Sequence, residues 1–253
     1  MSTVLVLTGA SSGIGASIAK IYLTKPNTFL VAVARSQDKL QKIVDEHGSE
    51  RVGIVVGDVC DESTVKASIE LAVKKFGKVN TVICNAGVLY PVETVDNANI
   101  DSWKSSFDVN FFSVVNLAKY AIPELRKTSG NFISVSSGAS VGATSGWGCY
   151  GASKAALNHL MLTIAEAEQD IKTVSIAPGV VDTPMQGEIR EKHSKSMKPE
   201  SHKRFTDLFK DNKLLPPEVP AKVYVNLALK NDWDSSMNGK YFRYNDESLK
   251  PYQ

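Results

Sequence analysis

The sequence of 253 residues predicts one doubly wound α/β domain: a mostly parallel sheet of about seven strands with helices on both faces. Short β-branched or aliphatic runs alternate with longer amphipathic stretches, which is the pattern of repeated βαβ units. Several of these runs are apolar throughout, as strands buried on both faces are. Folds of this class and length are often one unit, and no repeat, low-complexity tract or Pro/Gly-rich linker divides the sequence. We therefore expect residues 1–253 to form a single domain.

The apolar runs predict the strands in chain order. We expect strands at Val4–Leu7, Phe29–Ala34, Val52–Val56, Thr81–Cys84, Asn131–Val135, Thr173–Ala177 and, as a short last strand, near Lys240–Phe242. The amphipathic stretches between the strands predict the helices. We expect these near Ile14–Thr24, Gln37–His47, Glu62–Phe76 with Asp61 as its N-cap, Ile100–Lys127, Tyr150–Ala167 and Glu218–Leu229.

The segment at about residues 182–217 interrupts this alternation. It is long, polar and charged, and it contains no predicted strand. A loop of such length is usually functional or mobile. We therefore expect it to form a substrate lid.

The charge balance excludes some classes of partner. Lys and Arg number 29 and Asp and Glu 27, so the formal net charge of +2 creates no global field for nucleic acid or anionic lipid. The densest basic stretch, Arg190 to Arg204, is interrupted by Glu191 and Glu200 and is typical of a solvated helix face. We therefore expect a small-molecule substrate rather than a nucleic-acid or membrane partner.

Cysteine usage indicates a reducing compartment. Cys60, Cys84 and Cys149 are odd in number and show neither a CxxC pair nor metal-ligand spacing. The start of the sequence lacks a basic n-region, and its apolar run is too short for a signal peptide or a membrane span. We expect free thiols, no metal and a cytoplasmic protein.

A glycine-rich turn follows the first predicted strand. The run Thr8-Gly9-Ala10-Ser11-Ser12-Gly13-Ile14-Gly15 leads directly into a predicted helix. Glycines let the backbone approach a pyrophosphate, whose charge is stabilised by the helix N-terminus. A simple glycine-rich turn is the alternative, but the position between strand and helix favours a dinucleotide site.

These residues resemble the TGxxxGxG motif of the short-chain dehydrogenases/reductases, a family with a Rossmann-type fold. Further motifs follow in the same order as in that family. They are Cys84-Asn85-Ala86-Gly87, which resembles NNAG with Cys84 replacing the first Asn; Val109-Asn110-Phe111; Ser136-Ser137; Tyr150-Gly151-Ala152-Ser153-Lys154, which fits YxxxK; and Pro178-Gly179 with Thr183. The resemblance runs from about Thr8 to Thr183 and covers most of the chain.

The resemblance implies a set of cofactor contacts. Its members are Gly9, Ser11, Ser12, Gly13, Ile14, Gly15, Asp58, Val59, Asn85, Ala86, Gly87, Tyr150, Lys154, Pro178, Gly179, Val181 and Thr183. Asp58 resembles the family's adenine-contacting Asp, whereas Val181 and Thr183 resemble the residues that hold the nicotinamide carboxamide.

The residues after the second strand predict which dinucleotide binds. An acid about 20 residues beyond the glycines usually holds the ribose 2′-hydroxyl of NAD, but that place is taken by Ala34. Arg35 and Ser36 offer a guanidinium and a hydroxyl suited to a 2′-phosphate. The alternative is that Arg35 only ends a surface strand. We expect NADP(H).

Tyr150 and Lys154 lie four positions apart on a predicted helix, so their side chains share one face. A nearby ammonium stabilises a phenolate, and moving a tyrosine pKa from about 10 to about 7 requires roughly 4 kcal/mol. The resemblance implies hydride transfer to a carbonyl carbon, with Tyr150 protonating the oxygen and Ser137, preferred over Ser136, polarising it. It also implies a proton relay through the backbone carbonyl of Asn110 and a bound water near Lys154.

The resemblance also indicates the substrate class. The family's pocket positions are Val88, Leu89, Tyr90, Gly138, Trp147, Met185 and, less clearly, Phe209. These residues are mainly apolar or aromatic, which favours a bulky hydrophobic ketone or diketone over the alternative of ordinary packing. The segments Val135–Val141 and Arg243–Glu247 look most like fungal benzil reductase-like members, with sepiapterin reductases as more distant relatives.

Several alternatives stay open at this stage. The same residues could oxidise a hydrophobic secondary alcohol, and the fold could serve a non-enzymatic NADP-sensing or scaffold protein. The resemblance suggests a homodimer formed through the long helices that begin near Ile100 and Tyr150. Cys149, next to the catalytic tyrosine, is either an oxidation-sensitive thiol or a small packing residue.

Overall fold

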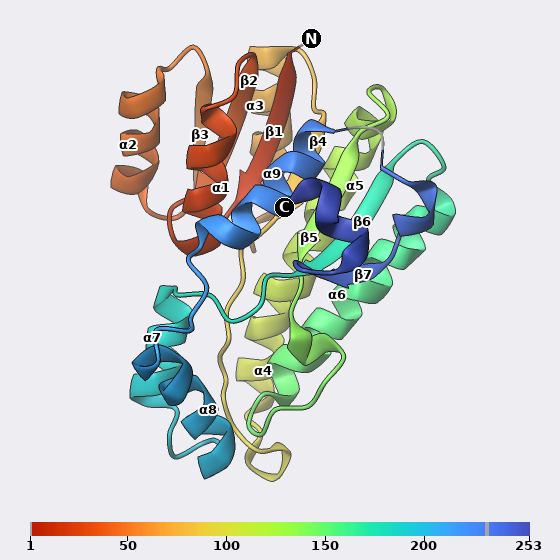
Figure 1. The fold of residues 1–253 in the computed structure, drawn as a ribbon. Coiled ribbons are helices and arrows are strands. Elements are labelled where there is room, and N and C mark those ends of the chain that lie inside the picture. Colours follow the sequence, from red (N-terminus) through yellow and green to blue (C-terminus); the bar gives the residue numbers. More distant parts are fainter. Residues whose placement is uncertain (1, 231–232) are drawn as a thin grey trace.

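The computed structural model describes residues 2–230 and 233–253, and within them seven parallel strands form one sheet in the order β3-β2-β1-β4-β5-β6-β7 (Figure 1). The strands are β1 (Thr3–Thr8), β2 (Thr28–Ala34), β3 (Val52–Val56), β4 (Thr81–Cys84), β5 (Asn131–Val135), β6 (Lys172–Ala177) and β7 (Tyr241–Arg243). Every predicted strand is present, and each end lies within one residue of its expected position. The predicted doubly wound fold is confirmed.

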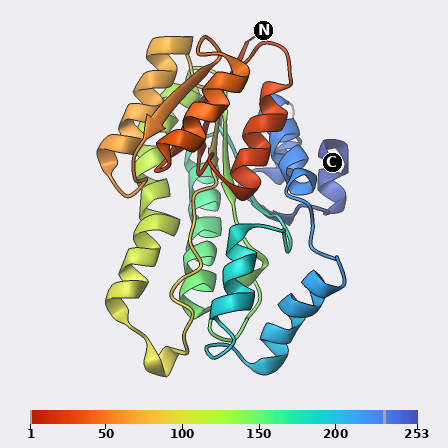
Figure 2. The ribbon, with the colours of Figure 1, turned by 90° about the vertical axis from the view of Figure 1, so that its left-hand side faces the viewer.

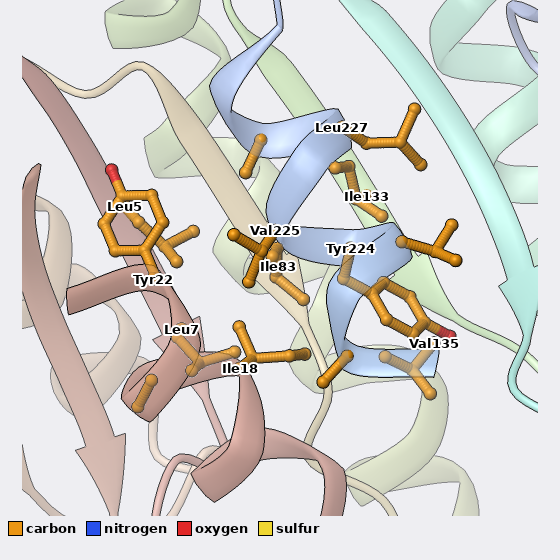
Figure 3. Packing of buried hydrophobic residues seen from close by; sticks show 14 of the residues in the cluster. Leu5, Leu7, Ile18, Tyr22, Ile83, Ile133, Val135, Tyr224, Val225 and Leu227 are labelled. Atoms are coloured by element: carbon orange, nitrogen blue, oxygen red, sulfur yellow. The ribbon is translucent and has the colours of Figure 1, made fainter. Parts of the chain in front are cut away.

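The central strands are mostly apolar because helices cover both faces of the sheet, and the buried Ser134 and Ser175 of β5 and β6 pair with each other. Along β1, Leu5 points to one face and Val6 to the other, and both are fully buried. Leu5 belongs to a cluster with Ile18 and Tyr224, which is shown in Figure 3. Val6 belongs to a second cluster on the opposite face. These two apolar layers hold the carboxyl ends of the strands in fixed positions.

The helices between the strands follow most of the sequence prediction. They are α1 (Gly13–Leu23), α2 (Gln37–His47), α3 (Glu62–Phe76), α4 (Ile100–Phe107), α5 (Ser113–Arg126), α6 (Gly148–Ala167), α7 (Pro184–Lys192), α8 (Pro199–Lys210) and α9 (Glu218–Leu229). Asp61 occupies the N-cap position of α3 as expected, although its side chain makes no capping hydrogen bond. None of the described helices is both long and apolar enough to cross a lipid bilayer.

The predicted helix Ile100–Lys127 is not continuous. A π-helical turn, η2 (Asp108–Phe112), separates α4 from α5. Asn110 lies at the centre of this turn and is fully buried. Such turns insert an extra residue into a helix and are frequent at functional sites, and hydrophobic periodicity alone does not predict them.

The segment after β6 is helical rather than a loop. Residues 184–192 and 199–210 form α7 and α8, each with a proline in its first turn. Only one narrow stripe of each short helix is buried, so most of its residues are polar. The sequence of this segment therefore resembles that of a loop. Both helices lie beyond the carboxyl ends of the strands (Figures 1 and 2).

The strand order also fixes where a ligand binds. The order reverses between β1 and β4, because the chain winds outward in one direction through β2 and β3 and in the other through β5, β6 and β7. Ligands of open α/β sheets bind at such a switch point, beyond the carboxyl ends of the strands. The turns after β1 and β4 meet at this crevice.

Candidate active site

The turn between β1 and α1 keeps side chains away from its backbone, so that an anion could approach it closely. Gly9 has a φ of +67°, in the left-handed region that favours glycine. A Cβ on Gly15 would lie 2.1 Å from the carbonyl oxygen of Gly9, so a side chain cannot fit there. The Ser12 side chain makes no capping hydrogen bond, and the first turn of α1 contains no acid. The first amide groups of α1 and its helix dipole are therefore suited to an anion.

The turn after β4 is tied to this glycine turn. The Thr8 hydroxyl accepts hydrogen bonds from the backbone N–H groups of Asn85 and Ala86, both at 3.1 Å. The Asn85 Nδ2 donates to the carbonyl oxygens of Thr8 and Gly9, both at 3.0 Å. Asn85, which was predicted to contact the cofactor, therefore holds the backbone of the glycine turn in place. Thr8 belongs to the motif, but sequence reasoning assigned it no role.

The end of β2 carries the residues predicted to select the cofactor. Ala34 is buried, whereas Arg35 and Ser36 are exposed. An Arg35 Nη1 lies 3.8 Å from an Asp58 carboxylate oxygen, and the two side chains are 76% and 39% exposed. Val59, beside Asp58, is buried. Since an exposed ion pair contributes about 0–1 kcal/mol, the guanidinium is free to turn toward a phosphate at little cost.

Tyr150 and Lys154 face the same side of α6, as predicted. Both are buried, at 8% and 3% exposure. The Lys154 Nζ lies 5.9 Å from the centroid of the Tyr150 ring and donates a hydrogen bond of 2.8 Å to the carbonyl oxygen of Val135 at the end of β5. One helix turn thus places an amine beneath a phenol at the carboxyl edge of the sheet.

Burial controls the acidity of both groups. It lowers the pKa of Lys154 from 10.5 to about 8, because the interior disfavours the ammonium. Burial likewise raises the pKa of Tyr150, and hydrogen bonding with Ser137 opposes that rise. The expected acidification of Tyr150 by Lys154 is therefore not produced by the side chains alone, since burial raises the pKa of Tyr150 more than the hydrogen bond with Ser137 lowers it.

Asn110 fastens the π-helical turn to the loop after β4. Its Oδ1 accepts from the N–H of Val88 and its Nδ2 donates to the Val88 carbonyl oxygen, both at 2.9 Å, while Nδ2 also lies 3.1 Å from the Ser153 hydroxyl. A Cβ on Gly87 would lie 3.2 Å from the Asn110 Oδ1 and 3.4 Å from the Lys154 Nζ. Gly87, Asn110 and Lys154 therefore converge, as the motifs predicted, and the side chain of Asn110 is committed to structural bonds.

A serine and asparagine network supports Ser137. Asn158, one turn beyond Lys154 on α6, accepts from the Ser136 hydroxyl at 2.6 Å and donates to the Ser140 hydroxyl at 2.9 Å. The Ser140 hydroxyl donates to the Ser137 carbonyl oxygen at 2.6 Å. The Ser137 hydroxyl accepts from the Ala139 N–H at 3.2 Å, so its own proton is left to donate. Sequence analysis missed Asn158, although its spacing of four from Lys154 was a usable signal.

The segment after β6 returns to the glycine turn. Val181 is buried, and Pro178, Gly179 and Thr183 are partly buried. A Cβ on Gly13 would lie 3.2 Å from the Thr183 methyl group, so this segment and the phosphate turn are neighbours. The turn predicted to hold the phosphates and the residues predicted to hold the carboxamide therefore lie side by side.

An apolar cluster covers Tyr150. Its buried members are Leu89, Val92, Tyr150, Ile189, Met197 and Phe205. The partly buried side chains of Ala139, Trp147, Val180 and Met185 pack against them and complete the cluster. Residues 182–217 therefore pack against Tyr150.

The predicted pocket residues differ in their surroundings. Leu89, Trp147 and Met185 belong to the apolar cluster. Tyr90 is 48% and Phe209 50% exposed, and the Arg190 guanidinium lies 3.9 Å from the centroid of the Phe209 ring. Phe205, one turn earlier on α8, is buried in the position that was expected for Phe209. The sequence does not show which face of α8 is buried, so it could not distinguish the two phenylalanines.

The remaining predicted pocket positions are backbone sites. Val88 is held by Asn110 through its N–H and carbonyl groups. Gly138 is exposed at the start of the short 3₁₀ turn η3 (Gly138–Ser140). Neither residue belongs to the apolar cluster.

The three cysteines are free thiols, as expected. Cys84, which replaces the first Asn of NNAG, is buried, and burial raises the pKa of its thiol. Cys149 is buried with its Sγ 3.8 Å from the Trp103 carbonyl oxygen. Burial also raises the pKa of the Cys149 thiol, which favours the unreactive packing role over that of a redox-sensitive group.

Comparisons with known proteins agree with this geometry. The chain is 43% identical over 263 residues to the benzil reductase ((S)-benzoin forming) of Saccharomyces cerevisiae, covering 100% of both chains. The crystal structure of a Saccharomyces cerevisiae short-chain dehydrogenase/reductase has a TM-score of 0.97 and 43% identity, again with 100% of both chains covered. The structure of the KRED1-Pglu enzyme has a TM-score of 0.92 and 45% identity over 95% of this chain and 100% of that one.

The family model described as short chain dehydrogenase matches residues 3–194. That range includes the glycine turn, Asn110, Ser137, Tyr150 and Lys154. The fold is one that binds a nicotinamide cofactor, and the chain is an oxidoreductase that is similar in sequence to the benzil reductase. The chain therefore belongs to the short-chain dehydrogenase/reductase family.

Proposed function

We propose that this protein is an NADPH-dependent carbonyl reductase that converts a bulky hydrophobic ketone or aromatic diketone to an alcohol. One observation carries the proposal: the Tyr150 side chain packs in an apolar cluster, with the Lys154 Nζ 5.9 Å from the centroid of its ring, at the carboxyl edge of the sheet. An apolar cleft with a few convergent polar groups is the usual form of such a substrate site. The likeness to the benzil reductase supports an aromatic diketone as the substrate class.

The residues around the crevice fit NADP(H). The glycine turn accepts a pyrophosphate because Gly9 and Gly15 keep side chains out of the space and the N-terminus of α1 faces it. Ala34 adds no negative charge at the end of β2, and the exposed Arg35 and Ser36 would hold the 2′-phosphate. Asp58 and Val59 would border the adenine, and Val181 and Thr183 the carboxamide.

The chain's own side chains would carry the proton chemistry. When bound, the reduced nicotinamide supplies the hydride that a substrate carbonyl carbon accepts. Tyr150 donates its proton to the carbonyl oxygen, and Ser137 donates a hydrogen bond that polarises the same oxygen. Lys154 stabilises the phenolate that remains. Positioned general acids of this kind contribute about 10²–10⁴-fold to the rate.

Asn110 would take part in returning a proton to Tyr150. Its side chain is occupied by Val88 and Ser153, so its backbone carbonyl is the group left to hold a relay water near Lys154. The side-chain bonds keep the π-helical turn, and with it that carbonyl, in place.

The proposal includes a lid, a homodimer and a cytoplasmic location. Residues 182–217 would act as the lid, because α7 and α8 contribute to the cluster over Tyr150. Ile100, Phe112 and Val115 are exposed on α4, η2 and α5, which supports dimer formation through these helices together with α6. The free thiols support a reducing compartment. Analytical ultracentrifugation tests the dimer: a sedimentation coefficient of the monomer at micromolar concentration would contradict it.

The function is tested by steady-state kinetics. The purified protein is mixed with NADPH or NADH and with aromatic diketones, quinones, pterins and steroid ketones, and the reverse reaction is run with NADP⁺ and the matching alcohols. We expect NADPH oxidation with an aromatic diketone and a strong preference for NADPH in kcat/KM. Equal efficiency with NADH would refute the cofactor assignment, and turnover of alcohols alone would refute the carbonyl reductase assignment.

A further inference from the structure

The apolar cluster over Tyr150 contains one unexplained polar group. Its members are Leu89, Val92, Tyr150, Ile189, Met197, Phe205, Ala139, Trp147, Val180 and Met185. The only side-chain oxygen or nitrogen atoms in this set are the hydroxyl of Tyr150 and the Nε1 of Trp147. The first is the proton donor of the proposed reaction. The second has no part in it so far.

The Trp147 Nε1 is buried and has no hydrogen-bond partner among residues 2–230 and 233–253. A buried N–H donor without a partner costs about 1–3 kcal/mol, and most such groups in native proteins are paired. An indole nitrogen can only donate a hydrogen bond. Its natural complement is therefore an acceptor oxygen that enters the cluster from outside the chain.

The indole is held in place by aromatic rings on two sides. It meets the Tyr150 ring edge-on, with centroids 5.7 Å apart, and stacks on the Phe205 ring of α8 at 5.1 Å with an interplanar angle of 19°. Its backbone is fixed as well, because the Trp147 N–H donates to the Thr144 carbonyl oxygen at 3.1 Å. Turning Nε1 toward solvent would break the stack on Phe205, so the donor stays inside the cluster.

We propose that the Trp147 Nε1–H binds the second carbonyl oxygen of a vicinal diketone whose first carbonyl is reduced at Tyr150. The inference rests on the proposed function and specifies its substrate. Trp147 and Tyr150 are neighbouring rings, and the two oxygens of a vicinal diketone sit on adjacent carbons. The surrounding Leu89, Met185 and Phe205 would contact the aromatic substituents. Trp147 thereby selects the diketone over a monoketone of the same shape.

The test compares two substrates in one variant. Trp147→Phe keeps a ring that stacks on Phe205 but removes the N–H. The substrates are benzil and deoxybenzoin, which share both phenyl rings and differ in the second carbonyl. We expect the ratio of kcat/KM for benzil to kcat/KM for deoxybenzoin to fall about tenfold in the variant, since a tenfold change corresponds to about 1.4 kcal/mol, within the range of one hydrogen bond.

Phe205→Leu serves as the matched control, because it removes the stacking partner and keeps the N–H. It should lower kcat/KM for both ketones alike. Calorimetric titration with NADPH, expected to give wild-type affinity in both variants, establishes that the cofactor site is intact. If Trp147→Phe loses this binding, Trp147→Leu replaces it, because leucine also has no hydrogen-bond donor.

The outcomes separate the inference from the proposed function. An unchanged ratio in Trp147→Phe, or an equal loss on both substrates, overturns the role of Trp147 while the wild-type turnover of benzil still supports the reductase. Failure of the wild-type protein to oxidise NADPH with either ketone overturns both. A selective loss on benzil supports the inference.

Discussion

Replacing Lys154 with methionine should stabilise the protein while it abolishes carbonyl reduction. Lys154 is 3% exposed, and burial lowers its pKa from 10.5 to about 8. Below pH 8 the folded chain therefore holds an ammonium in an environment that disfavours it. Methionine has a similar length and no charge, so the substitution removes this cost together with the group that supports Tyr150.

The magnitude follows from the two pKa values. Between about pH 8 and 10.5 the unfolded chain binds a proton that the folded chain does not, so stability from this group rises with pH in that window. At pH 7 the burial of the ammonium costs about 3 kcal/mol, at about 1.4 kcal/mol for each pKa unit. Losing the bond from Nζ to the Val135 carbonyl oxygen costs about 1 kcal/mol. The variant should be more stable by about 2 kcal/mol at pH 7.

The advantage should shrink as the pH rises. At pH 9.5 the native lysine is largely neutral, the remaining cost is about 1 kcal/mol, and the lost hydrogen bond offsets it. Urea unfolding of both proteins, followed by far-ultraviolet circular dichroism at pH 7 and pH 9.5, measures the difference. Lys39→Met, on the exposed surface of α2, is the control and should change little at either pH. If the variant is no more stable than wild type at pH 7, or if its advantage persists at pH 9.5, burial of the Lys154 ammonium does not destabilise the folded chain.

Three further substitutions test other parts of the site. Arg35→Ala should lower kcat/KM for NADPH by about 10–100-fold, the loss of one charge-assisted contact, and leave NADH unchanged in steady-state kinetics; an equal effect on both cofactors would contradict the assignment. Asn158→Ala removes the acceptor of the Ser136 hydroxyl and the amide that donates to the Ser140 hydroxyl, and it should lower kcat with unchanged NADPH affinity by calorimetry, with partial rescue in Asn158→Asp; wild-type kcat would exclude a positioning role. Asn110→Leu leaves the N–H and carbonyl of Val88 unpaired and should lower the urea-derived free energy of unfolding by about 2–5 kcal/mol; a change below 1 kcal/mol would show that the loop after β4 does not depend on Asn110.

The sheet and the phosphate turn could be predicted because they obey local rules. A parallel strand buried on both faces is mostly apolar, and the apolar runs predicted the strand ends to within one residue. The glycine turn is equally explicit, since a Cβ at Gly15 would meet backbone at 2.1 Å. Tyr150 and Lys154 share a face because they are one helix turn apart. These features depend on neighbours in sequence.

The features that the sequence concealed depend on tertiary packing. The helices α7 and α8 bury one narrow stripe each, so their composition resembled that of a loop. Nothing local distinguishes Phe205, which stacks on Trp147, from Phe209, which lies under Arg190. The rise in the Tyr150 pKa is also a product of burial by distant segments. Motifs thus predicted which groups would react but not the buried environment that raises the pKa of Tyr150 and lowers that of Lys154.

The Tyr150→Phe variant tests whether Tyr150 is the proton donor of an NADPH-dependent carbonyl reductase. The measurement is its kcat for reduction of an aromatic diketone, taken alongside its calorimetric affinity for NADPH. We predict a fall in kcat of at least about 100-fold with NADPH affinity near that of the wild type. A kcat within about tenfold of wild type would show that Tyr150 is not the proton donor, because positioned proton transfer contributes more than that.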